Sequence, residues 1–224
     1  MPGEYKSYSA KFEPFERHAD RYDAWFDSER GRRVFPLEVQ CLKDVLDGLP
    51  RPWLEIGVGT GRFAAALGIP HGIDPSTEAI KYAERRGIQV ERGFAEKLPY
   101  KAGSYATIAM IVTVCFLAEP SKAFAECARV LRPKGSLVVG LVPKHSPWGQ
   151  LYARKGQQGH PFYLPATFYS CREVVALAER HGMTFIQAQS CLVEQPDKEL
   201  HDLQPPKPGM HENAGFVGMH FMKQ

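Results

Sequence analysis

The sequence predicts an α/β protein in which a mostly parallel sheet carries helices on both faces. Two observations predict this fold. Short apolar segments alternate with helical segments between residues 53 and 142, and that order gives parallel strands joined by crossover helices. A glycine-rich turn at residues 57–61 separates the first such strand from the helix after it. We expect seven strands and a single domain over residues 1–224.

Residues 1–50 predict an N-terminal helical cap. Four side chains recur at helical spacing and mark one apolar face: Phe15, Ala19, Tyr22 and Phe26. Gly31 is expected to interrupt this helix, and a second helix is expected over residues 37–46.

Residues 51–142 predict the core of the sheet. The expected strands cover residues 53–56, 71–74, 88–92, 106–114 and 136–142. The expected helices cover residues 62–67, 77–86 and 122–131. The segment 106–114 is apolar on both faces, as a central parallel strand requires.

The last third of the chain breaks this alternation. Residues 143–170 are rich in Pro, Gly and aromatic side chains, which predicts an ordered loop or a small cap. Residues 171–224 predict a helix over 172–180 and two strands over 185–194 and 215–221. A Pro-rich excursion, 201–209, is expected to join these strands.

Composition excludes several classes of protein. The net charge is +3 with no long run of Lys and Arg, so we expect no nucleic-acid partner. The five cysteines are scattered and show no CxxC pair, so we expect no metal site and no disulfide framework. No apolar stretch is long enough to span a membrane, and the first residues lack a secretory signal. We expect a cytoplasmic protein, as a monomer or a homodimer.

The glycine loop is the strongest functional signal. The segment LEIGVGTGRF (54–63) has the spacing GxGxG rather than the GxGxxG of a dinucleotide loop. Glu55 lies two residues before the first glycine, where its charge would repel a pyrophosphate and favour a ligand that carries an ammonium group. S-adenosylmethionine (SAM) carries both an ammonium and a sulfonium. A tight turn without a ligand is the alternative interpretation.

An acidic residue follows the second strand. Asp74 ends the segment GIDPS (72–76). The two oxygens of a carboxylate match the two hydroxyls of a ribose, and sheets of this kind place an acid at this point for that purpose. The alternative is that Asp74 only caps the next helix.

With these residues in place, the chain resembles the class I SAM-dependent methyltransferases, and within them the type 11 branch of small-molecule enzymes similar to those of ubiquinone biosynthesis. Four blocks carry the resemblance: residues 54–63, 72–76, 93–100 and 109–140. It covers nearly the whole chain. The resemblance implies a Rossmann-like fold, SAM as cofactor, S-adenosylhomocysteine as product, and in-line transfer of a methyl group to a small-molecule acceptor.

The resemblance also implies roles for individual residues. The cofactor-binding set would be Glu55, Gly57, Gly59, Gly61, Asp74, Pro75, Ser76, Ala95, Glu96, Met110 and Ile111. The glycines would line the methionine part, Glu55 would bind the ammonium group, and Asp74 would bind the ribose. Phe94 stands where many relatives have Asp, so a side-chain acceptor for the adenine amino group is missing.

The acceptor side is less defined. The expected substrate-side residues are Tyr22, Trp25, Cys115, Trp148 and Tyr163. These aromatic faces suit a sulfonium or a planar substrate, although they could equally pack the cap against the core. The candidate bases are His145, His160 and Tyr22. Methyl transfer depends mainly on alignment and exclusion of water, so a base is optional.

Two other functions stay open from sequence. One is a non-catalytic regulatory module that binds SAM or a nucleotide. The other is an NAD-dependent oxidoreductase, which the glycine spacing and Glu55 disfavour.

Overall fold

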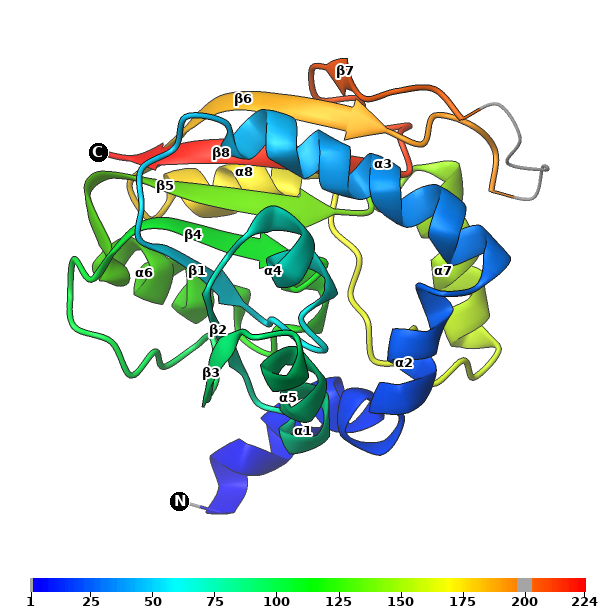
Figure 1. Cartoon of the computed structure of the whole chain (residues 1–224), viewed down its shortest axis with the longest axis horizontal. Helices are drawn as coiled ribbons and strands as arrows, with labels where there is room; N and C mark the ends of the chain where they lie inside the picture. The colour runs from blue at the N-terminus through cyan, green and yellow to red at the C-terminus, as the bar shows by residue number, and fades with distance from the viewer. Residues whose placement is uncertain (1, 197–202) are drawn as a thin grey trace.

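The computed structural model describes residues 2–196 and 203–224, with side chains from residue 10 onward. The fold is an eight-stranded sheet in the order β3-β2-β1-β4-β5-β8-β6-β7 (Figure 1). The strands are β1 (Trp53–Ile56), β2 (His71–Asp74), β3 (Gln89–Arg92), β4 (Tyr105–Ile111), β5 (Leu131–Leu141), β6 (Met183–Cys191), β7 (Lys207–Pro208) and β8 (Phe216–Lys223). The first five are parallel, and β8 lies antiparallel between β5 and β6. The α/β fold with a mostly parallel sheet is confirmed, and β7, only two residues long, is the strand beyond the expected seven.

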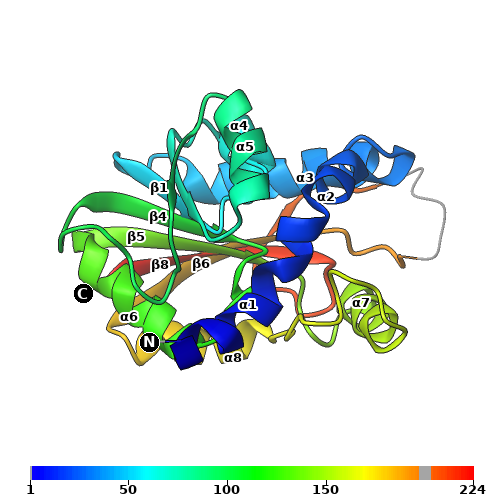
Figure 2. The ribbon, with the colours of Figure 1, turned by 90° about the horizontal axis from the view of Figure 1, so that it is seen from below.

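Helices cover both faces of the sheet (Figure 2). The helices are α1 (Pro2–Arg17), α2 (Ala19–Trp25), α3 (Glu29–Leu46), α4 (Arg62–Leu67), α5 (Thr77–Arg85), α6 (Pro120–Val130), α7 (Pro147–Gln157) and α8 (Cys171–Glu179), with a short 3-10 turn, η1, at Val114–Phe116. On one face lie α3, α4 and α5, and on the other lie α6 and α8. The remaining helices, α1, α2 and α7, lie beyond the carboxyl ends of the central strands (Figure 1).

The N-terminal region differs from the expected break at Gly31. Helix α3 begins at Glu29, and the Ser28 side chain caps it by accepting a bond of 3.0 Å from the Gly31 amide. A Cβ on Gly31 would lie 2.1 Å from the Trp25 carbonyl oxygen. The glycine therefore allows the tight corner between α2 and α3 instead of ending a helix. As a result α3 packs on the sheet, and only α1 and α2 of residues 1–50 lie over the strand ends.

Residues 143–170, for which the sequence predicts an ordered loop or a small cap, contain the helix α7. Ser146 caps α7 by accepting a bond of 3.0 Å from the Gly149 amide. Gly149 and Gly156 resemble helix breakers in sequence, but both mark close packing: a Cβ would lie 2.2 Å from the Pro143 carbonyl oxygen and 2.6 Å from that of Tyr163, respectively.

The C-terminal pair of strands forms as expected, with boundaries shifted by a few residues. The Pro-rich excursion contributes β7, while its first two residues, 201–202, lie outside the described part of the chain.

Two apolar clusters hold the layers together, one on each face of the sheet. Alternate residues of β4 point to opposite clusters, with Ile108 and Met110 on the α6 and α8 side and Ala109 and Ile111 on the α3 and α4 side. This double burial is the reason that β4 is apolar throughout. No helix of the described residues is long and apolar enough to cross a membrane.

Candidate active site

The loop between β1 and α4 turns on three glycines in left-handed backbone geometry. The φ angles are +71° at Gly57, +51° at Gly59 and +78° at Gly61. An added Cβ on Gly57 would lie 2.4 Å from the Thr113 side chain, and one on Gly61 would lie 2.8 Å from Ala83. Gly59 faces open space, with nothing within 4 Å of such a Cβ. Gly59 is therefore the glycine whose bare main chain leaves room for a ligand.

Asp74 is buried beside this loop at the end of β2. Its Oδ2 accepts a bond of 2.8 Å from the Gly59 amide, and its Oδ1 accepts one of 2.9 Å from the Ser76 amide. Burial raises the pKa of the carboxyl to about 6, although both amide bonds act in the opposite direction. The side chain therefore fixes the loop and also presents a carboxylate to the adjoining cavity.

Glu55 is buried beneath the loop. Burial, together with the nearby Asp74, raises the pKa of its carboxyl well above the usual range. Its Oε2 has no hydrogen-bond partner among the described residues. A buried oxygen without a partner is unfavourable, and a group that donates hydrogen bonds would satisfy it, but Glu55 lines neither of the two cavities described below.

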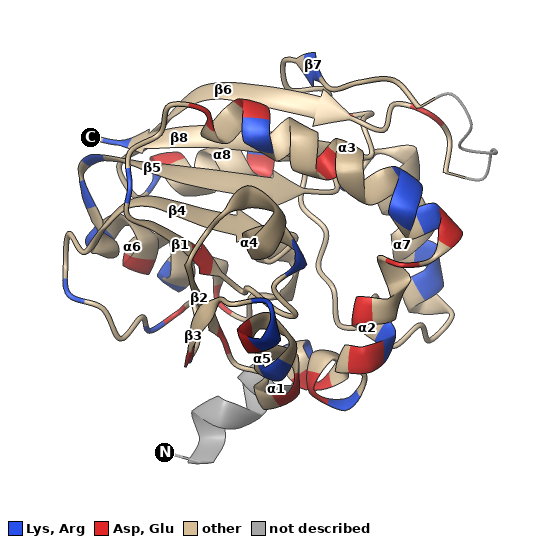
Figure 3. Ribbon diagram, viewed as in Figure 1, with Lys and Arg blue, Asp and Glu red and all other residues tan. Residues whose placement is uncertain are grey.

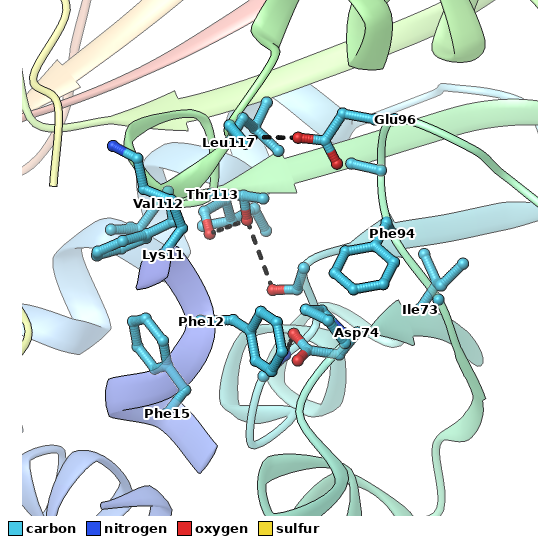
Figure 4. Close-up of a pocket in the computed structure, with 18 of the residues that line it drawn as sticks. Lys11, Phe12, Phe15, Ile73, Asp74, Phe94, Glu96, Val112, Thr113 and Leu117 are labelled. Atoms are coloured by element: carbon cyan, nitrogen blue, oxygen red, sulfur yellow. Dashed lines mark hydrogen bonds between the residues drawn. The ribbon is translucent and has the colours of Figure 1, made fainter. Parts of the chain in front are cut away.

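A narrow cavity of about 90 Å³ opens between the glycine loop and α1 (Figure 4). Seven of the expected cofactor-binding residues line it: Gly57, Gly59, Asp74, Pro75, Ala95, Glu96 and Ile111. The Glu96 Oε1 accepts bonds of 3.0 Å and 3.2 Å from the amides of Ala118 and Glu119, so it also holds the chain after β4 in place.

The other expected cofactor-binding residues lie behind the cavity wall. Glu55 is buried under the glycine loop, and Gly61 packs against Ala83 of α5. Ser76 caps α5 through the Ala79 amide at 3.1 Å, and its hydroxyl donates to Glu16 of α1 at 2.9 Å. Met110 is fully buried in the core.

Aromatic side chains close the opposite side of this cavity. Figure 4 shows Phe12 and Phe15 of α1 projecting toward the loop, with Phe12 beside Asp74 and Phe94. The rings of Phe12 and Phe94 meet edge to face at 5.7 Å between centroids. Phe94 thus packs within an aromatic wall, at the position where the family resemblance implies an acid. Sequence reasoning assigned no site role to the α1 residues of this wall.

Lys11 ties α1 to the chain after α7. Its Nζ donates bonds of 2.6 Å to the Pro165 carbonyl and 2.9 Å to the Thr167 hydroxyl. Helix α1 therefore bridges the glycine-loop side and the α7 side of the opening.

A second, larger cavity of about 440 Å³ adjoins the first. The two share four lining residues: Phe15, Tyr22, Val112 and Phe116. Aromatic side chains from α2, α7 and the segments directly after them form much of the second lining: Tyr22, Trp25, Phe26, Tyr152, His160, Phe162, Tyr163, Phe168 and Tyr169. We call it the aromatic cavity.

Val112 stands at the junction of the two cavities with a φ of +53°. A β-branched residue rarely adopts this geometry, and such strain concentrates at functional sites. The strain is held by the bond of 2.8 Å from its amide to the Gly140 carbonyl. The next side chain, Thr113, donates to the carbonyls of Ile56 and Ile111, which fixes the ends of β1 and β4.

Four of the five expected substrate-side residues line the aromatic cavity: Tyr22, Trp25, Cys115 and Tyr163. Trp148 does not. It is buried beneath α7, where its Nε1 donates 2.8 Å to the Glu194 carbonyl and its ring would block any side chain at Gly215.

The candidate bases separate clearly. His145 is exposed and lines neither cavity. His160 lines the aromatic cavity, where burial and the charges of Arg21 and Lys155 lower its pKa and favour the neutral imidazole. Burial holds the pKa of Tyr22 far above its usual range, so this phenol stays protonated. Burial likewise raises the pKa of the Cys115 thiol to about 12.

Glu38 of α3 is a site residue that sequence reasoning missed. It lines the aromatic cavity, is 8% exposed, and has a pKa that burial raises to about 8. One signal was available: Glu38 falls four residues after Val34 and four before Leu42, on the apolar face of the helix.

Helix α2 is fixed to the glycine loop by ion pairs. Asp23 is buried and accepts bonds of 2.8 Å from Arg62 and 2.9 Å from Arg86. Burial alone would raise the pKa of Asp23, but the two guanidinium groups hold it below its usual range. Arg62 directly follows the glycine loop, so the ion pair with Asp23 joins α2 to this loop.

Comparison with known proteins agrees with this geometry. Residues 54–139 match the methyltransferase domain family. A Mycobacterium tuberculosis protein of unknown function is 37% identical over 93% of this chain and 73% of its own length. The crystal structure of a SAM-dependent methyltransferase from Thermotoga maritima, called a "possible histamine N-methyltransferase", superposes with a TM-score of 0.87 at 33% identity, over 96% of this chain and all of that one.

A more distant structure shares the fold alone. The geranyl diphosphate C-methyltransferase of Streptomyces coelicolor, solved with S-adenosylhomocysteine, has a TM-score of 0.60 at 13% identity, over 86% of this chain and 80% of that one. The similar proteins, the matched domain and the glycine loop with its two acids all indicate the same family. The chain belongs to the class I SAM-dependent methyltransferases, in the type 11 branch, and is an enzyme that takes its methyl group from SAM.

Proposed function

We propose that the protein methylates a small organic molecule held in the aromatic cavity. The observation that supports this most is the junction of the two cavities, which share Tyr22, Val112 and Phe116 among their lining residues. A cofactor on the glycine loop and an acceptor in the aromatic cavity would meet there. Both lie at the carboxyl ends of the strands, where sheets of this class bind ligands.

The chemistry asks little of the protein beyond placement. A lone pair of the acceptor forms the new bond to the methyl carbon as the carbon–sulfur bond breaks and its electrons pass to sulfur. Asp74 and the Gly59 main chain would hold the ribose and methionine ends of SAM. The aromatic walls from α1, α2 and α7 would exclude water and fix the angle of approach.

The size and cover of the aromatic cavity favour a small acceptor over a macromolecule. At about 440 Å³ it falls in the range of small-molecule sites. The relative from T. maritima is called a "possible histamine N-methyltransferase", and histamine is a small molecule. A purely regulatory module would not need a second cavity of this volume beside the cofactor loop.

The test combines binding with turnover. Titration calorimetry should show that SAM and S-adenosylhomocysteine bind and that NADH does not. Incubation with SAM and a panel of small acceptors should release S-adenosylhomocysteine. The Gly59→Val variant should lose both, because its side chain would fill the open space beside the loop. Binding of SAM with no turnover on any acceptor would instead favour the regulatory module, and binding of NADH alone would contradict the proposal.

A further inference from the structure

The aromatic cavity contains a carboxyl group that the methyl-transfer proposal does not use. Glu38 lies near the middle of α3, between apolar residues that pack on the sheet, and only 8% of it is exposed. Among the described residues no hydrogen bond or ion pair to its side chain is found. Carboxyl groups at such positions are rare because burial without a partner is unfavourable.

The groups around Glu38 cannot neutralise it. The hydroxyls of Tyr22, Tyr152 and Tyr163 are close enough for the Glu38 charge to raise the pKa of each. These phenols are protonated and uncharged. The cationic residues of the lining, Arg21 and Lys155, are both exposed, so they belong to the mouth of the cavity. The charge of Arg30 acts on Tyr152 and Tyr163, but its guanidinium donates to the Pro196 carbonyl and lies over the Trp148 ring. Figure 3 shows the basic residues of α7 at this outer end of the molecule.

The remaining lining suits a cation. Trp25, Phe26 and Phe162 add aromatic faces whose electron density attracts positive charge. Tyr152 and Tyr163 stack at 4.5 Å between centroids and form a flat wall. An acid with several aromatic faces around it is an arrangement that binds ammonium groups.

We propose that the methyl acceptor is an organic amine that binds as an ammonium to Glu38 among these aromatic faces. The ammonium passes one proton to the Glu38 carboxylate, which frees the nitrogen lone pair that forms the bond to the methyl carbon as the carbon–sulfur bond breaks. This inference rests on the proposed methyl transfer and adds the chemical class of the acceptor. A neutral acceptor would leave the carboxyl without a partner in an apolar site. An anionic acceptor would not stabilise the ionised carboxyl, whereas an ammonium supplies both the opposite charge and hydrogen-bond donors.

The experiment compares matched amines and alcohols on the protein saturated with S-adenosylhomocysteine. The probes are 2-phenylethylamine with 2-phenylethanol, tryptamine with tryptophol, and histamine with its alcohol analogue. We expect at least one amine to bind about 10- to 100-fold more tightly than its alcohol, since a charge-assisted bond is replaced by a neutral one. Glu38→Gln should reduce this preference to near one.

Two variants serve as controls. Glu29→Gln removes an exposed carboxylate from the same helix and should keep the preference for the amine. Glu38→Asp keeps the charge on a shorter side chain and should retain part of the preference, which also covers the case that Glu38→Gln fails to fold. S-adenosylhomocysteine affinity should be unchanged in all three variants.

The outcomes separate this inference from the proposed function. Equal binding of amines and alcohols, a preference that survives in Glu38→Gln, or no binding of any amine would overturn the role of Glu38. Methylation of the alcohols without that of the amines would keep methyl transfer and refute the amine class. Failure of S-adenosylhomocysteine to bind at all would refute the proposed function itself.

Discussion

At the scale of single residues, Asp74 combines two tasks, and a conservative substitution should impair both. Both of its oxygens accept backbone amides, from Gly59 and Ser76. In Asp74→Asn an amide NH2 must face one of these N–H donors, so the loop loses a bond and the ribose loses an anionic acceptor. We expect S-adenosylhomocysteine affinity to fall about 10- to 100-fold. Calorimetry measures this, with Glu78→Gln on the exposed side of α5 as the control.

The same carboxyl predicts a pH dependence of cofactor binding. Burial raises the pKa of Asp74 to about 6, so the group becomes protonated as pH falls through that value. The protonated form offers the ribose hydroxyls a poorer acceptor. Affinity for S-adenosylhomocysteine should therefore drop between about pH 7 and pH 5, while that of Asp74→Asn stays level. A wild-type affinity without any change in this range would contradict the placement of ribose at Asp74.

Glu38 predicts a pH dependence of stability. The pKa of its carboxyl is about 8 in the folded protein and takes the ordinary value of 4.5 in the unfolded chain. Between these values the folded state binds more protons than the unfolded state, so this group makes the protein less stable as pH rises. Glu38→Gln removes that contribution. Its free energy of unfolding should exceed that of the wild type by about 4 kcal/mol at pH 8 and match it near pH 4.

Chemical denaturation of both proteins across this range measures the difference. The other titrating carboxyls, Asp74 and Glu55, are common to both and cancel. A difference that stays constant with pH would show that Glu38 does not titrate as a buried group.

Residues with a local signal could be predicted from sequence, and those defined by contacts could not. The glycines and Asp74 belong to one strand–loop–strand unit, so their spacing alone places them near a ligand. Glu38 reaches its cavity only because α3 packs on the sheet, and Lys11 reaches its cavity only because α1 lies over the strand ends. Trp148 shows the converse, since an aromatic residue in a predicted cap became part of the core.

At the scale of elements, the glycine loop predicts different results for two similar substitutions. Gly57→Ala forces a Cβ against the Thr113 side chain at 2.4 Å, in addition to its left-handed φ. Gly59→Ala has a left-handed φ as well but open space around the Cβ. We expect Gly57→Ala to lower the free energy of unfolding by about 2–4 kcal/mol and Gly59→Ala by about 1 kcal/mol.

For cofactor affinity we expect the more stable variant, Gly59→Ala, to be impaired. The Cβ of Gly59→Ala enters the space left for the ligand, so this variant should fold well and bind S-adenosylhomocysteine weakly. Thermal unfolding and calorimetry on the same two samples test both statements. Normal affinity in Gly59→Ala would show that the ligand does not lie against this glycine.

The ion pairs of Asp23 with Arg62 and Arg86 should stabilise the position of α2 over the site. Asp23→Asn leaves Arg62 and Arg86 facing a neutral side chain in a partly buried position. We expect a loss of about 2–3 kcal/mol in the free energy of unfolding and faster hydrogen exchange confined to α2 and the glycine loop. Glu13→Gln removes a carboxylate from an exposed pair and should change neither. Exchange that is unchanged in Asp23→Asn would contradict the link between α2 and the glycine loop.

Elements with strong periodicity were predicted more reliably than those that depend on packing. The strands and helices between residues 53 and 142 follow from local apolar patterning and agree with the structure to within three residues, except that β5 begins at Leu131, five residues before the expected start. Helix α7 and the start of α3 were missed for one reason: glycines that allow close backbone contact resemble helix breakers in sequence.

At the scale of the whole molecule, the sheet and its covering helices behave as one ligand-binding unit. Strands β1, β2 and β4 end at the cofactor cavity, and the N-terminal helices α1 and α2 complete its wall. The site thus combines the N-terminal helices with the strand ends and loops of residues 57–118, and no local sequence pattern predicts that these segments lie together. A bound ligand that contacts both should stabilise the entire fold rather than one loop.

This predicts a large response to the cofactor product. S-adenosylhomocysteine at 100 times its dissociation constant should add about 2.7 kcal/mol to the free energy of unfolding. For a protein of 224 residues this corresponds to a rise in Tm of roughly 5–10 °C. Hydrogen-exchange protection should extend to α1 and α2 as well as to the glycine loop, because all three face the ligand. NADH at the same concentration should shift neither quantity. Protection limited to the loop would show that α1 and α2 do not close on the cofactor, and the enclosed site argued from their aromatic wall would then fail.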